Sequence, residues 1–596
     1  MKDVLKTAHF LAKHCGVKSG DHIGLICDNR KEWLECDLSI LSLGAVDVPR
    51  GTDTKLSEIA FILQHAKVKG VIFENIDSFL ALNKECPAFC KKLKFIIIID
   101  PATKQKITKV KTVTKIIHYA DIAKTSISSQ EEQMMEKKIE KVELDDIATI
   151  IYTSGTTNEP KGACITHRNF LFQIDRVVPE RISLNPKDIL LTILPIWHIF
   201  EREVNYITIC VGAGLAYSKP IGSVFLEDIK NIQPSFLTSV PRIWEGVYQA
   251  VKRKVSQGSP IKKLFFASGV FVGKMHSYIK HLKNATIPAF TPANRIRFIE
   301  KAVGYPLYYL LFPIRAVLDL LVFKKIRKLL GPNFKCGISG GGSLVQGVDD
   351  FFQAANIKLL NGYGLTETSP VLAVRNEYRP EYNGVGKILK DVEYKVLDEY
   401  GYPVKAGKKG VLHVKCDQVM AGYYNNPKAT SEVLSKDGWL NTGDIVVMSP
   451  KGDIKIIGRE KNTIVLSNGK NIEPEFVENT VLQSPYIDNV VVLGQDKKFL
   501  SALIVPNKEM LQKKAQELGI VNDEIEVLYN DQQIRNVIQS ELEKISRTLS
   551  AYEKILQFTL IHTSFTVGKE LTQTLKIKRY YIHKEYAKEI QKLLAN

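Results

Sequence analysis

Ile151-Tyr-Thr-Ser-Gly-Thr-Thr-Asn-Glu-Pro-Lys-Gly162 is the stretch around which the rest of the chain is arranged. It continues an apolar, β-branched run that begins at Ile147 and predicts a buried strand. Small residues let a backbone approach a ligand, hydroxyl groups donate hydrogen bonds, and lysine adds a compact positive charge. The stretch therefore predicts a loop that grips a polyphosphate, with these candidate residues: Thr153, Ser154, Gly155, Thr156, Thr157 and Lys161.

The spacing of this loop differs from that of the common nucleotide-binding loop. In that loop a glycine, four residues and then Gly-Lys-Ser/Thr follow one another, and this order is absent here. A stretch rich in serine, threonine and glycine is also typical of an ordinary polar turn. Taken alone, the stretch favours the turn, so the prediction of a phosphate site depends on the rest of the chain.

The composition predicts a multidomain protein of the reducing cytoplasm. A chain of 596 residues is too long for one compact core, so two or more domains are expected. No run of eighteen uncharged apolar residues predicts a membrane span, and the first residues lack the apolar core of a signal peptide. The nine cysteines form no Cys-x-x-Cys pair, which indicates free thiols rather than disulfides or a zinc site.

The formal net charge of +18 admits several partners. Nucleic acid, an anionic membrane surface and an anionic substrate such as a nucleotide would each complement it. Lysine recurs along the whole chain, which favours a solvated basic surface. Because no nucleic-acid-binding motif accompanies the charge, we expect no nucleic-acid partner.

Apolar strands alternate with helical patterns through the first 125 residues. Residues 22–27, 68–73 and 95–99 are predicted strands, and residues 4–15 and 32–43 have helical spacing. Strand, helix and strand in repetition indicate a parallel sheet covered by helices. We therefore predict an α/β fold for this part of the chain.

A histidine follows another predicted strand. Residues 188–194 form an apolar run that ends in Pro195-Ile-Trp-His-Ile-Phe-Glu-Arg202. Parallel sheets bind ligands at the carboxyl ends of their strands. A lone histidine is more often structural, but its place after this strand makes His198 a candidate site residue.

The segment Tyr305–Phe323 is strongly apolar and leads into Lys324-Lys-Ile-Arg-Lys328. Pro306, Pro313 and two charged residues interrupt it, which argues against a helix that spans a membrane. The favoured interpretation is a pair of helices packed on the core. The alternative is an interfacial element whose aromatic and basic residues contact a membrane surface.

Two further turns follow predicted strands in the second half of the chain. Residues 334–338 lead into Gly340, Gly341 and Gly342, and residues 357–361 lead into Gly362-Tyr-Gly-Leu-Thr-Glu-Thr368. Beyond Pro370, short strands and turns predict a small β-rich lobe. From residue 460 new alternating strands indicate an α+β unit, so we predict domains of residues 1–459 and 460–596.

Three of these stretches together carry a family resemblance: Thr153–Gly162, Tyr363–Thr368, and Thr442-Gly-Asp444 with Gly458-Arg459. In this order and spacing the chain resembles the adenylate-forming superfamily of acyl-CoA synthetases, adenylation domains and luciferases. Leu194–Arg202 looks like the Leu-Pro-x-x-His-x-Phe-Glu-Arg motif of long-chain fatty acyl-CoA synthetases. The resemblance covers nearly the whole chain. It implies a large N-terminal domain of helix-covered sheets with a β-rich lobe, followed by a smaller, mobile C-terminal lid.

The resemblance also implies the reaction. A long-chain fatty acid attacks the α-phosphorus of ATP to give acyl-AMP and pyrophosphate, and coenzyme A then displaces AMP to give a thioester. The first step brings anions together, so it needs positive charge and Mg²⁺. We expect ATP, Mg²⁺, coenzyme A and a fatty acid as ligands of a cytoplasmic enzyme that contacts the inner membrane surface peripherally.

Roles for single residues come from the same resemblance. Thr366 would bond the α-phosphate, Glu367 would ligate Mg²⁺, and Lys576 on the lid would be the adenylation lysine, with Lys578 as a nearby alternative. The glycines at 340–342 and Tyr363 would hold adenine, and Asp444 with Arg459 would hold ribose. The remaining assignments are a hinge, an aromatic gate to the acyl tunnel and the coenzyme A channel: Lys461, Trp244, Asn468 and Gly469.

Two features depart from the family pattern. Asn158 stands where the superfamily usually has glycine, although asparagine is the residue that best tolerates a positive φ in its place. Family members normally carry several dozen residues before the helix that is predicted at Val4, which suggests a shortened N-terminal part.

Two other functions stay open. An enzyme of the same kind could pass the acyl group to the phosphopantetheine of a carrier protein instead of coenzyme A. A protein of a different class would keep the fold as a catalytically silent acyl-binding or membrane-scaffolding protein. The presence of every charged site residue disfavours the silent protein.

Overall fold

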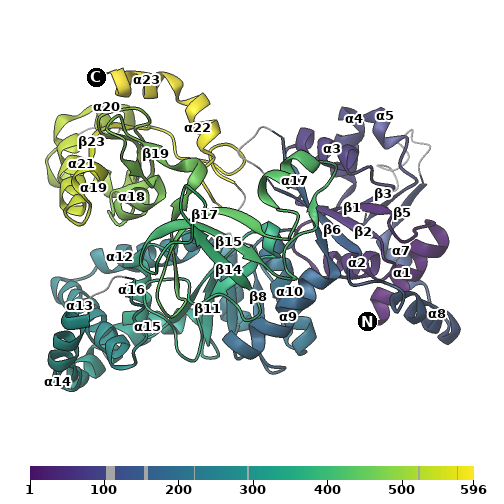
Figure 1. Ribbon diagram of the computed structural model, residues 1–596, viewed down its shortest axis with the longest axis horizontal. Helices are drawn as coiled ribbons and strands as arrows, with labels where there is room; N and C mark the ends of the chain where they lie inside the picture. The colour runs from purple at the N-terminus through teal and green to yellow at the C-terminus, as the bar shows by residue number, and fades with distance from the viewer. Residues whose placement is uncertain are drawn as a thin grey trace.

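The computed structural model describes residues 1–101, 115–153, 159–219, 222–290, 294–520, 524–572 and 575–595. Four of the predicted phosphate-loop residues lie outside these ranges: Ser154, Gly155, Thr156 and Thr157. Asn158 lies outside them too. Two large sheets, a four-stranded lobe and a C-terminal α+β unit follow one another along the chain (Figure 1).

The first sheet has eight strands and confirms the predicted α/β pattern. In spatial order they are β16 (Gly422–Tyr423), β7 (Lys161–Thr166), β6 (Ile147–Thr153), β2 (Val46–Arg50), β1 (His22–Ile26), β3 (Gly70–Phe73), β4 (Phe95–Ile98) and β5 (Lys115–His118). The strands from β6 to β5 are parallel, because helices return the chain between them. Those helices are α2 (Lys31–Leu41), α3 (Leu56–His65), α4 (Ile76–Glu85) and α5 (Pro87–Cys90). Around them lie α1 (Lys2–His14), α7 (Tyr119–Lys124) and α8 (Ser129–Ile139).

The second sheet has six strands. In order they are β13 (Val371–Val374), β12 (Lys358–Gly364), β11 (Cys336–Ser339), β10 (Phe236–Ser239), β8 (Ile189–Thr192) and β9 (Gly214–Tyr217). All its neighbouring strands are parallel except β12 and β13. Its helices are α9 (His167–Arg181), α10 (Ile199–Val211), α11 (Gly222–Ile232), α12 (Pro241–Ser256) and α16 (Gln346–Ala354). Thr166 caps the start of α9, since its hydroxyl accepts a hydrogen bond from the Asn169 amide.

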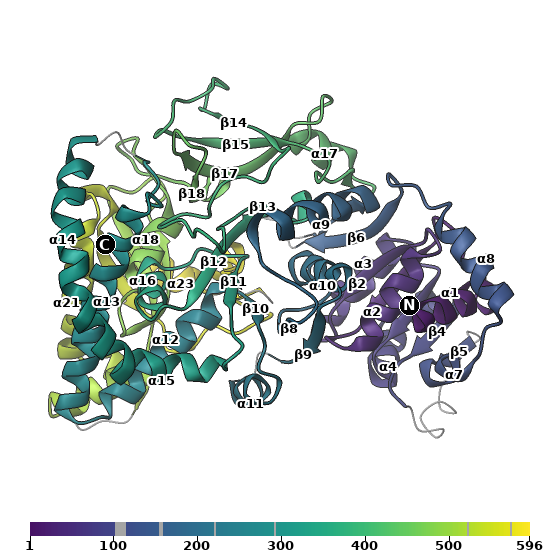
Figure 2. The same cartoon turned by 90° about the horizontal axis from the view of Figure 1, so that it is seen from below.

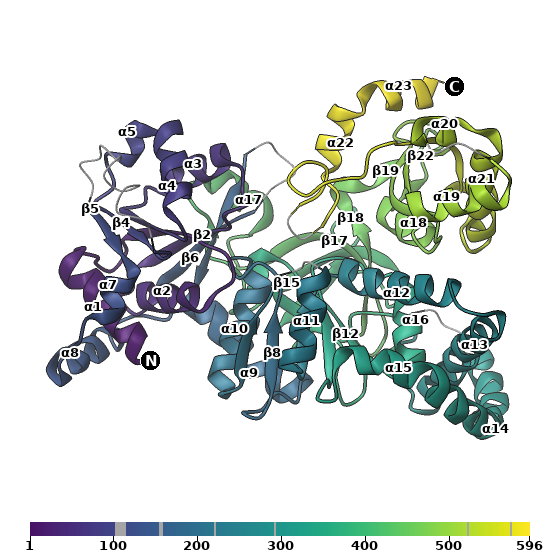
Figure 3. The same cartoon turned by 180° about the vertical axis from the view of Figure 1, so that it is seen from behind.

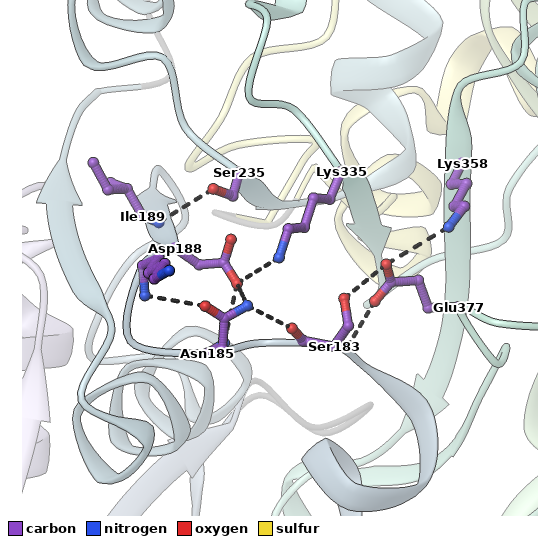
Figure 4. Close-up of polar contacts among 9 residues, drawn as sticks. Ser183, Asn185, Asp188, Ile189, Ser235, Lys335, Lys358 and Glu377 are labelled. Atoms are coloured by element: carbon purple, nitrogen blue, oxygen red, sulfur yellow. Dashed lines mark hydrogen bonds and ion pairs between the residues drawn. The ribbon is translucent and has the colours of Figure 1, made fainter.

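A polar network holds the amino ends of the strands in this second sheet (Figure 4). Lys335, just before β11, lies 2.8 Å from the carboxylate of Asp188, just before β8. Lys358 at the start of β12 lies 3.6 Å from Glu377, which also accepts hydrogen bonds from Ser183. These charged residues occupy the amino edge of the sheet. Ligands of parallel sheets bind at the opposite, carboxyl edge.

A buried cation joins the two sheets. Arg202 on α10 is fully buried and contacts Asp37 on α2 and Asp47 on β2, at 2.5 and 2.8 Å. It also donates to the hydroxyl groups of Thr149 and Tyr206, both at 2.8 Å. Because α10 belongs to the second sheet, this cluster fixes that sheet on the first.

The β-rich lobe and the C-terminal unit also agree with the predicted pattern. The lobe contains β14 (Glu393–Leu397), β15 (Lys409–Lys415), β17 (Leu440–Met448) and β18 (Ile454–Arg459), with α17 (Pro427–Val433) beside it. The C-terminal unit has a sheet of β21 (Ile487–Leu493), β22 (Leu500–Pro506) and β23 (Ile555–Leu560), and a pair β19 (Ile464–Val465) and β20 (Asn471–Ile472). Its helices are α18 (Pro474–Val481), α19 (Lys508–Glu517), α20 (Ile525–Asn530), α21 (Gln532–Ile545), α22 (Arg579–Glu585) and α23 (Ala587–Ala595).

The domain boundary after residue 459 remains our proposal. It is supported by two apolar clusters whose buried members all lie beyond residue 463. Each domain has its own hydrophobic core, so such clusters are what separate domains would contain.

The prediction of a helix pair over Tyr305–Phe323 is wrong. One helix, α14 (Asn294–Leu318), continues through Pro306 and Pro313 into a π-helical turn, Asp319–Phe323, and then into α15 (Lys324–Arg327). Each proline removes one helical hydrogen bond, but α14 packs along α13 (Pro260–Lys283), which supports the helix past both. By length and composition, Ala302–Leu330 could also cross a membrane, which the sequence argued against.

We predict that Arg202→Met lowers the free energy of unfolding by about 3–5 kcal/mol, because it leaves two buried carboxylates without a cation. Urea unfolding followed by circular dichroism measures this loss. Arg168→Met is the matched control, since Arg168 pairs with Asp145 at an exposed site, where solvent screens the pair and its loss costs little stability. Equal unfolding midpoints for the two variants would contradict a stabilising role of the cluster.

Candidate active site

A cavity of about 1460 Å³ opens at the carboxyl ends of the strands. Its walls come from both sheets, the β-rich lobe and the C-terminal unit, whose chain before α22 reaches into the centre of the molecule (Figure 3). This volume exceeds the ~300–1,000 Å³ of an ordinary small-molecule pocket, so it has room for more than one substrate.

The described part of the stretch Ile151–Gly162 borders this cavity. Thr153 at the end of β6 and Lys161 at the start of β7 are register partners in one pair of antiparallel strands. Thr153 lines the cavity. The Lys161 ammonium lies 5.3 Å from the centre of the Tyr423 ring. The two strands thus present Thr153 to the cavity and the Lys161 cation to Tyr423.

The glycine turn after β11 lies on the opposite wall. Gly340, Gly341 and Gly342 all line the cavity. Gly341 has a φ of +76°, which favours glycine. A side chain at Gly340 would meet the Phe200 ring at 3.1 Å. Because these three residues have no side chains, a flat ligand can approach the backbone of this turn closely.

The turn after β12 places two polar residues at the cavity, Thr366 and Glu367. Gly364 makes this turn, because a Cβ atom there would lie 1.6 Å from the Pro370 carbonyl oxygen. One oxygen of Glu367 accepts a hydrogen bond from the Tyr423 hydroxyl at 2.7 Å. That bond fixes the carboxylate beside the ring on which Lys161 lies.

Asp444, Arg459 and Tyr363 form one cluster. Asp444 and Arg459 are register partners on β17 and β18, with 2.8 Å between the Arg459 Nε and an Asp444 oxygen. The Tyr363 hydroxyl donates to the other Asp444 oxygen at 2.7 Å. Burial raises the pKa of Asp444, while Arg459, the Tyr363 hydrogen bond and Lys576 oppose that rise.

Lys576 reaches this cluster from the C-terminal unit. Its side chain is exposed to the open cavity, but the surrounding walls partly desolvate the ammonium and Arg459 repels it, which lowers its pKa to about 8, although Asp444 and Glu367 act in the opposite direction. Burial, with Lys576 and Arg50 nearby, lowers the pKa of His198 to about 3. His198 is therefore neutral at pH 7, and Lys576 supplies the positive charge beside it.

Lys578 lies in different surroundings. Its ammonium donates to the Gly568 carbonyl at 3.3 Å, and the charged groups around it include Glu58, Lys55 and Arg50. Of the two lysines, Lys576 is the one beside Asp444 and Glu367.

An apolar arm continues the cavity between α9, α10 and the second sheet. Aliphatic and aromatic side chains line it: Val177, Ile182, Leu184, Leu190, Val204, Ile207, Phe236 and Ile338. A carboxylic acid with a long hydrocarbon tail would have its tail in this arm and its head among the charged groups.

The predicted hinge residue lies at the cavity, whereas the predicted gate and coenzyme A residues lie elsewhere. Lys461 lines the cavity next to the end of β18. Trp244 is 1% exposed and packs against Phe352 and Gly337, away from the cavity that the described residues line. Asn468 and Gly469 occupy the exposed turn between β19 and β20, also away from it.

Three further residues shape the site: Tyr423, Gly364 and Arg202. Tyr423 connects Glu367 with Lys161, Gly364 makes the turn that carries Glu367, and Arg202 anchors the helix that begins next to His198. Only Arg202 had a signal in the sequence, since it ends the motif that begins at Leu194.

A large cavity with a glycine turn, a pair of strands that carries Thr153 and Lys161, and a lysine from a separate unit fits enzymes that activate carboxylic acids. Family comparisons agree: residues 1–424 match the AMP-binding enzyme family, and residues 461–596 match the AMP-binding enzyme C-terminal domain. The chain belongs to this family, the adenylate-forming superfamily that its motifs resemble.

Named relatives come from the same superfamily. The chain is 33% identical to probable acyl-activating enzyme 16, chloroplastic, of Arabidopsis thaliana, covering 97% of this chain and 82% of that protein. It is 32% identical to the Arabidopsis long-chain-fatty-acid–[acyl-carrier-protein] ligase AEE15, covering 97% and 80%. It is 28% identical to the Arabidopsis long chain acyl-CoA synthetase 7, peroxisomal, covering 97% and 79%.

Solved structures show the fold. The adenylation domain of a carboxylate reductase from Mycobacterium chelonae has a TM-score of 0.74 at 20% identity, covering 100% of this chain and 83% of that one. The solved structure shows the predicted large N-terminal and smaller C-terminal parts. Together, the family match and the relatives identify the protein as an adenylate-forming ligase of the acyl-activating kind.

The pKa of Lys576 gives a testable pH dependence. We predict that kcat/KM for ATP–pyrophosphate exchange falls as the pH rises through about 8, because the lysine must be protonated to contact two anions. In Lys576→Arg this fall should disappear, since arginine keeps its proton. Lys578→Arg is the matched control and should retain it. A wild-type fall that persists in Lys576→Arg would refute the assignment.

Proposed function

We propose that the protein is a long-chain-fatty-acid–CoA ligase. It activates the acid with ATP as acyl-AMP, releases pyrophosphate, and transfers the acyl group to the thiol of coenzyme A. The observation that carries this proposal is the cavity itself. Its charged end holds Lys576, Asp444 and Glu367, and its apolar arm suits a hydrocarbon tail.

The surroundings of each residue support a role toward ATP. Backbone at Gly340, Gly341 and Gly342 would approach adenine, and Tyr363 would lie against it. Asp444 would accept hydrogen bonds from the ribose hydroxyl groups, with Arg459 holding it in position. Thr366 would donate to the α-phosphate. Thr153, Lys161 and the loop between them would hold the outer phosphates.

Glu367 fits a magnesium site. Mg²⁺ is commonly held by one or two carboxylates together with substrate phosphates. Among the described residues no three histidines, cysteines or acids cluster as a metal site, so Glu367 would hold the ion together with the substrate phosphates. Tyr423 occupies one Glu367 oxygen at 2.7 Å and orients the other. The ion would neutralise charge on the phosphates during attack.

His198 and Lys576 would act on the reacting carboxylate. Lys576 would contact the carboxylate and the α-phosphate together, drawing two anions within reach of each other. His198 is neutral, so it would donate or accept a hydrogen bond without adding charge. Its ring is held at the start of α10, where its Nδ1 accepts the Phe200 amide at 3.3 Å.

The second half of the reaction would need the C-terminal unit to rotate. Lys461 would be the hinge, since it lies two residues after the last strand of the lobe. Rotation would remove Lys576 and bring Asn468 and Gly469 toward the cavity for coenzyme A. Trp244 packs against Gly337 and Phe352 outside the cavity, so its role as a gate for the tail would require this side chain to move. We also propose that the protein works in the cytoplasm, at a membrane surface from which it takes its fatty acid.

A carrier protein is the second candidate acceptor. The relative at 32% identity is named for transfer to an acyl carrier protein, and one at 28% is named for transfer to coenzyme A. Both functions share the adenylation step, so they differ only in the thiol that ends the reaction.

The test supplies palmitate and ATP with either coenzyme A or phosphopantetheinylated carrier protein. We expect pyrophosphate release with palmitate and thioester formation with coenzyme A. If the thioester forms only on the carrier protein, then the acceptor is the carrier protein and not coenzyme A. Lys576→Ala should lower adenylation by about 10²–10³-fold. Because Lys576 would leave the site before transfer, the same variant should still convert added palmitoyl-AMP to thioester.

A further inference from the structure

One side of α14, together with the π-helical turn after it, forms an apolar surface that faces away from the protein core. Between residues 302 and 323 its exposed side chains are aliphatic or aromatic: Val303, Tyr305, Tyr309, Leu310, Phe312, Ile314, Val317, Leu320 and Leu321. Only 11% of the most apolar 18-residue window is buried. In Figures 1 and 2 this helix runs along one edge of the molecule with α13 on its inner side. Exposed apolar surfaces of this extent mark interaction sites.

The charged residues of this segment face inward. Arg315 and Asp319 are its only charged residues, and they pair at 2.7 Å. Arg315 also donates to the carbonyl of Ala354, and Arg327 to that of Ala355, at 2.6 and 2.8 Å. Since those carbonyls end α16, both arginines tie α14 to the second sheet. The outer side is left without charge over about six helical turns.

Basic residues surround this apolar surface. Residues 260–330 contain 13 lysines and arginines but only 2 acidic residues, so most of the net charge of +18 lies here. Lys324, Lys325 and Lys328 follow directly after the apolar stretch and are exposed. At the other side, the Lys283 ammonium lies 2.9 Å from the Tyr309 hydroxyl and close to both Tyr308 and Tyr309 rings.

We propose that α13 and α14 dock the protein on an anionic membrane surface. The apolar side of α14 would enter the boundary between headgroups and acyl chains, and the flanking lysines would contact lipid phosphates. Amphipathic helices with basic flanks bind membranes in this way, and each basic residue near an anionic surface adds to the attraction. Charge complementarity is what selects a membrane over a second copy of this basic chain.

The contacts of α14 favour lying on the membrane over crossing it. Its inner side packs along α13, with the His276 and Tyr308 rings stacked at 4.4 Å. In turn α13 packs on α16, where a Cβ atom at Gly273 would lie 2.9 Å from that of Ala354. A helix held to the core along its length cannot also be surrounded by lipid, so only its outer side is free to enter.

Co-flotation of the full chain with vesicles tests this proposal. We expect binding to phosphatidylcholine vesicles that contain phosphatidylglycerol, little binding to pure phosphatidylcholine, and weaker binding as salt rises. Alkaline carbonate should release the bound protein. Protein that resists carbonate would overturn the interfacial placement in favour of a spanning helix.

Two triple variants separate charge from apolar insertion. Lys324→Glu with Lys325→Glu and Lys328→Glu should lower binding at least tenfold. Leu310→Gln with Ile314→Gln and Val317→Gln should lower it similarly without changing net charge. The matched control reverses three exposed lysines of the β-rich lobe: Lys405, Lys408 and Lys451. That control changes the net charge by the same amount as the Lys324 variant, and it should bind vesicles within twofold of the wild-type protein.

Two outcomes would overturn the docking surface. If the control weakens binding as much as the Lys324 variant does, then net charge and not this surface explains it. If light scattering shows a dimer that the Leu310 variant converts to a monomer while vesicle binding is unchanged, then the apolar surface binds a second copy. Circular dichroism and pyrophosphate release with a water-soluble short-chain acid verify that each variant is folded.

Discussion

The buried arginine on α10 is the interaction on which the arrangement of the molecule depends. Arg202 has no exposure, and its partners come from α2, β2 and β6 of the first sheet as well as from α10. Taking a guanidinium and two carboxylates from water is costly unless the geometry satisfies all of them. That condition fixes the angle between the two sheets, and the cavity lies where their strand ends meet.

The same helix positions the histidine that lies near Lys576. His198 precedes the first residue of α10, four positions before Arg202, so one turn of helix separates the chemistry from its anchor. Glu201 on this turn accepts hydrogen bonds from the Thr238 hydroxyl of β10. The motif Leu194–Arg202 thus contains His198, which faces the cavity, and Glu201 and Arg202, which hold α10 against the second and the first sheet.

Sequence patterns predicted most strands and the identity of many cavity residues, because those signals are local. Asp444 and Arg459 lie on neighbouring strands of a hairpin, and Thr153 and Lys161 close another, so spacing alone brings them together. Arg202 and its partners Asp37 and Asp47 are 165 and 155 residues apart, and no local pattern pairs them. The helix pair over 305–323 failed for a related reason. Proline rules describe an isolated helix, whereas packing on α13 carries α14 past both prolines.

The position of the C-terminal unit also changes the charge beside Asp444 and Glu367. Lys576 is the cation that this unit contributes there, whereas Arg459, which pairs with Asp444, belongs to the β-rich lobe. With Lys576 in place the two carboxylates face two cations, and with Lys576 withdrawn they face one. A rotating unit would therefore hold an anionic substrate more strongly when closed and release an anionic product more easily when open, through one side chain.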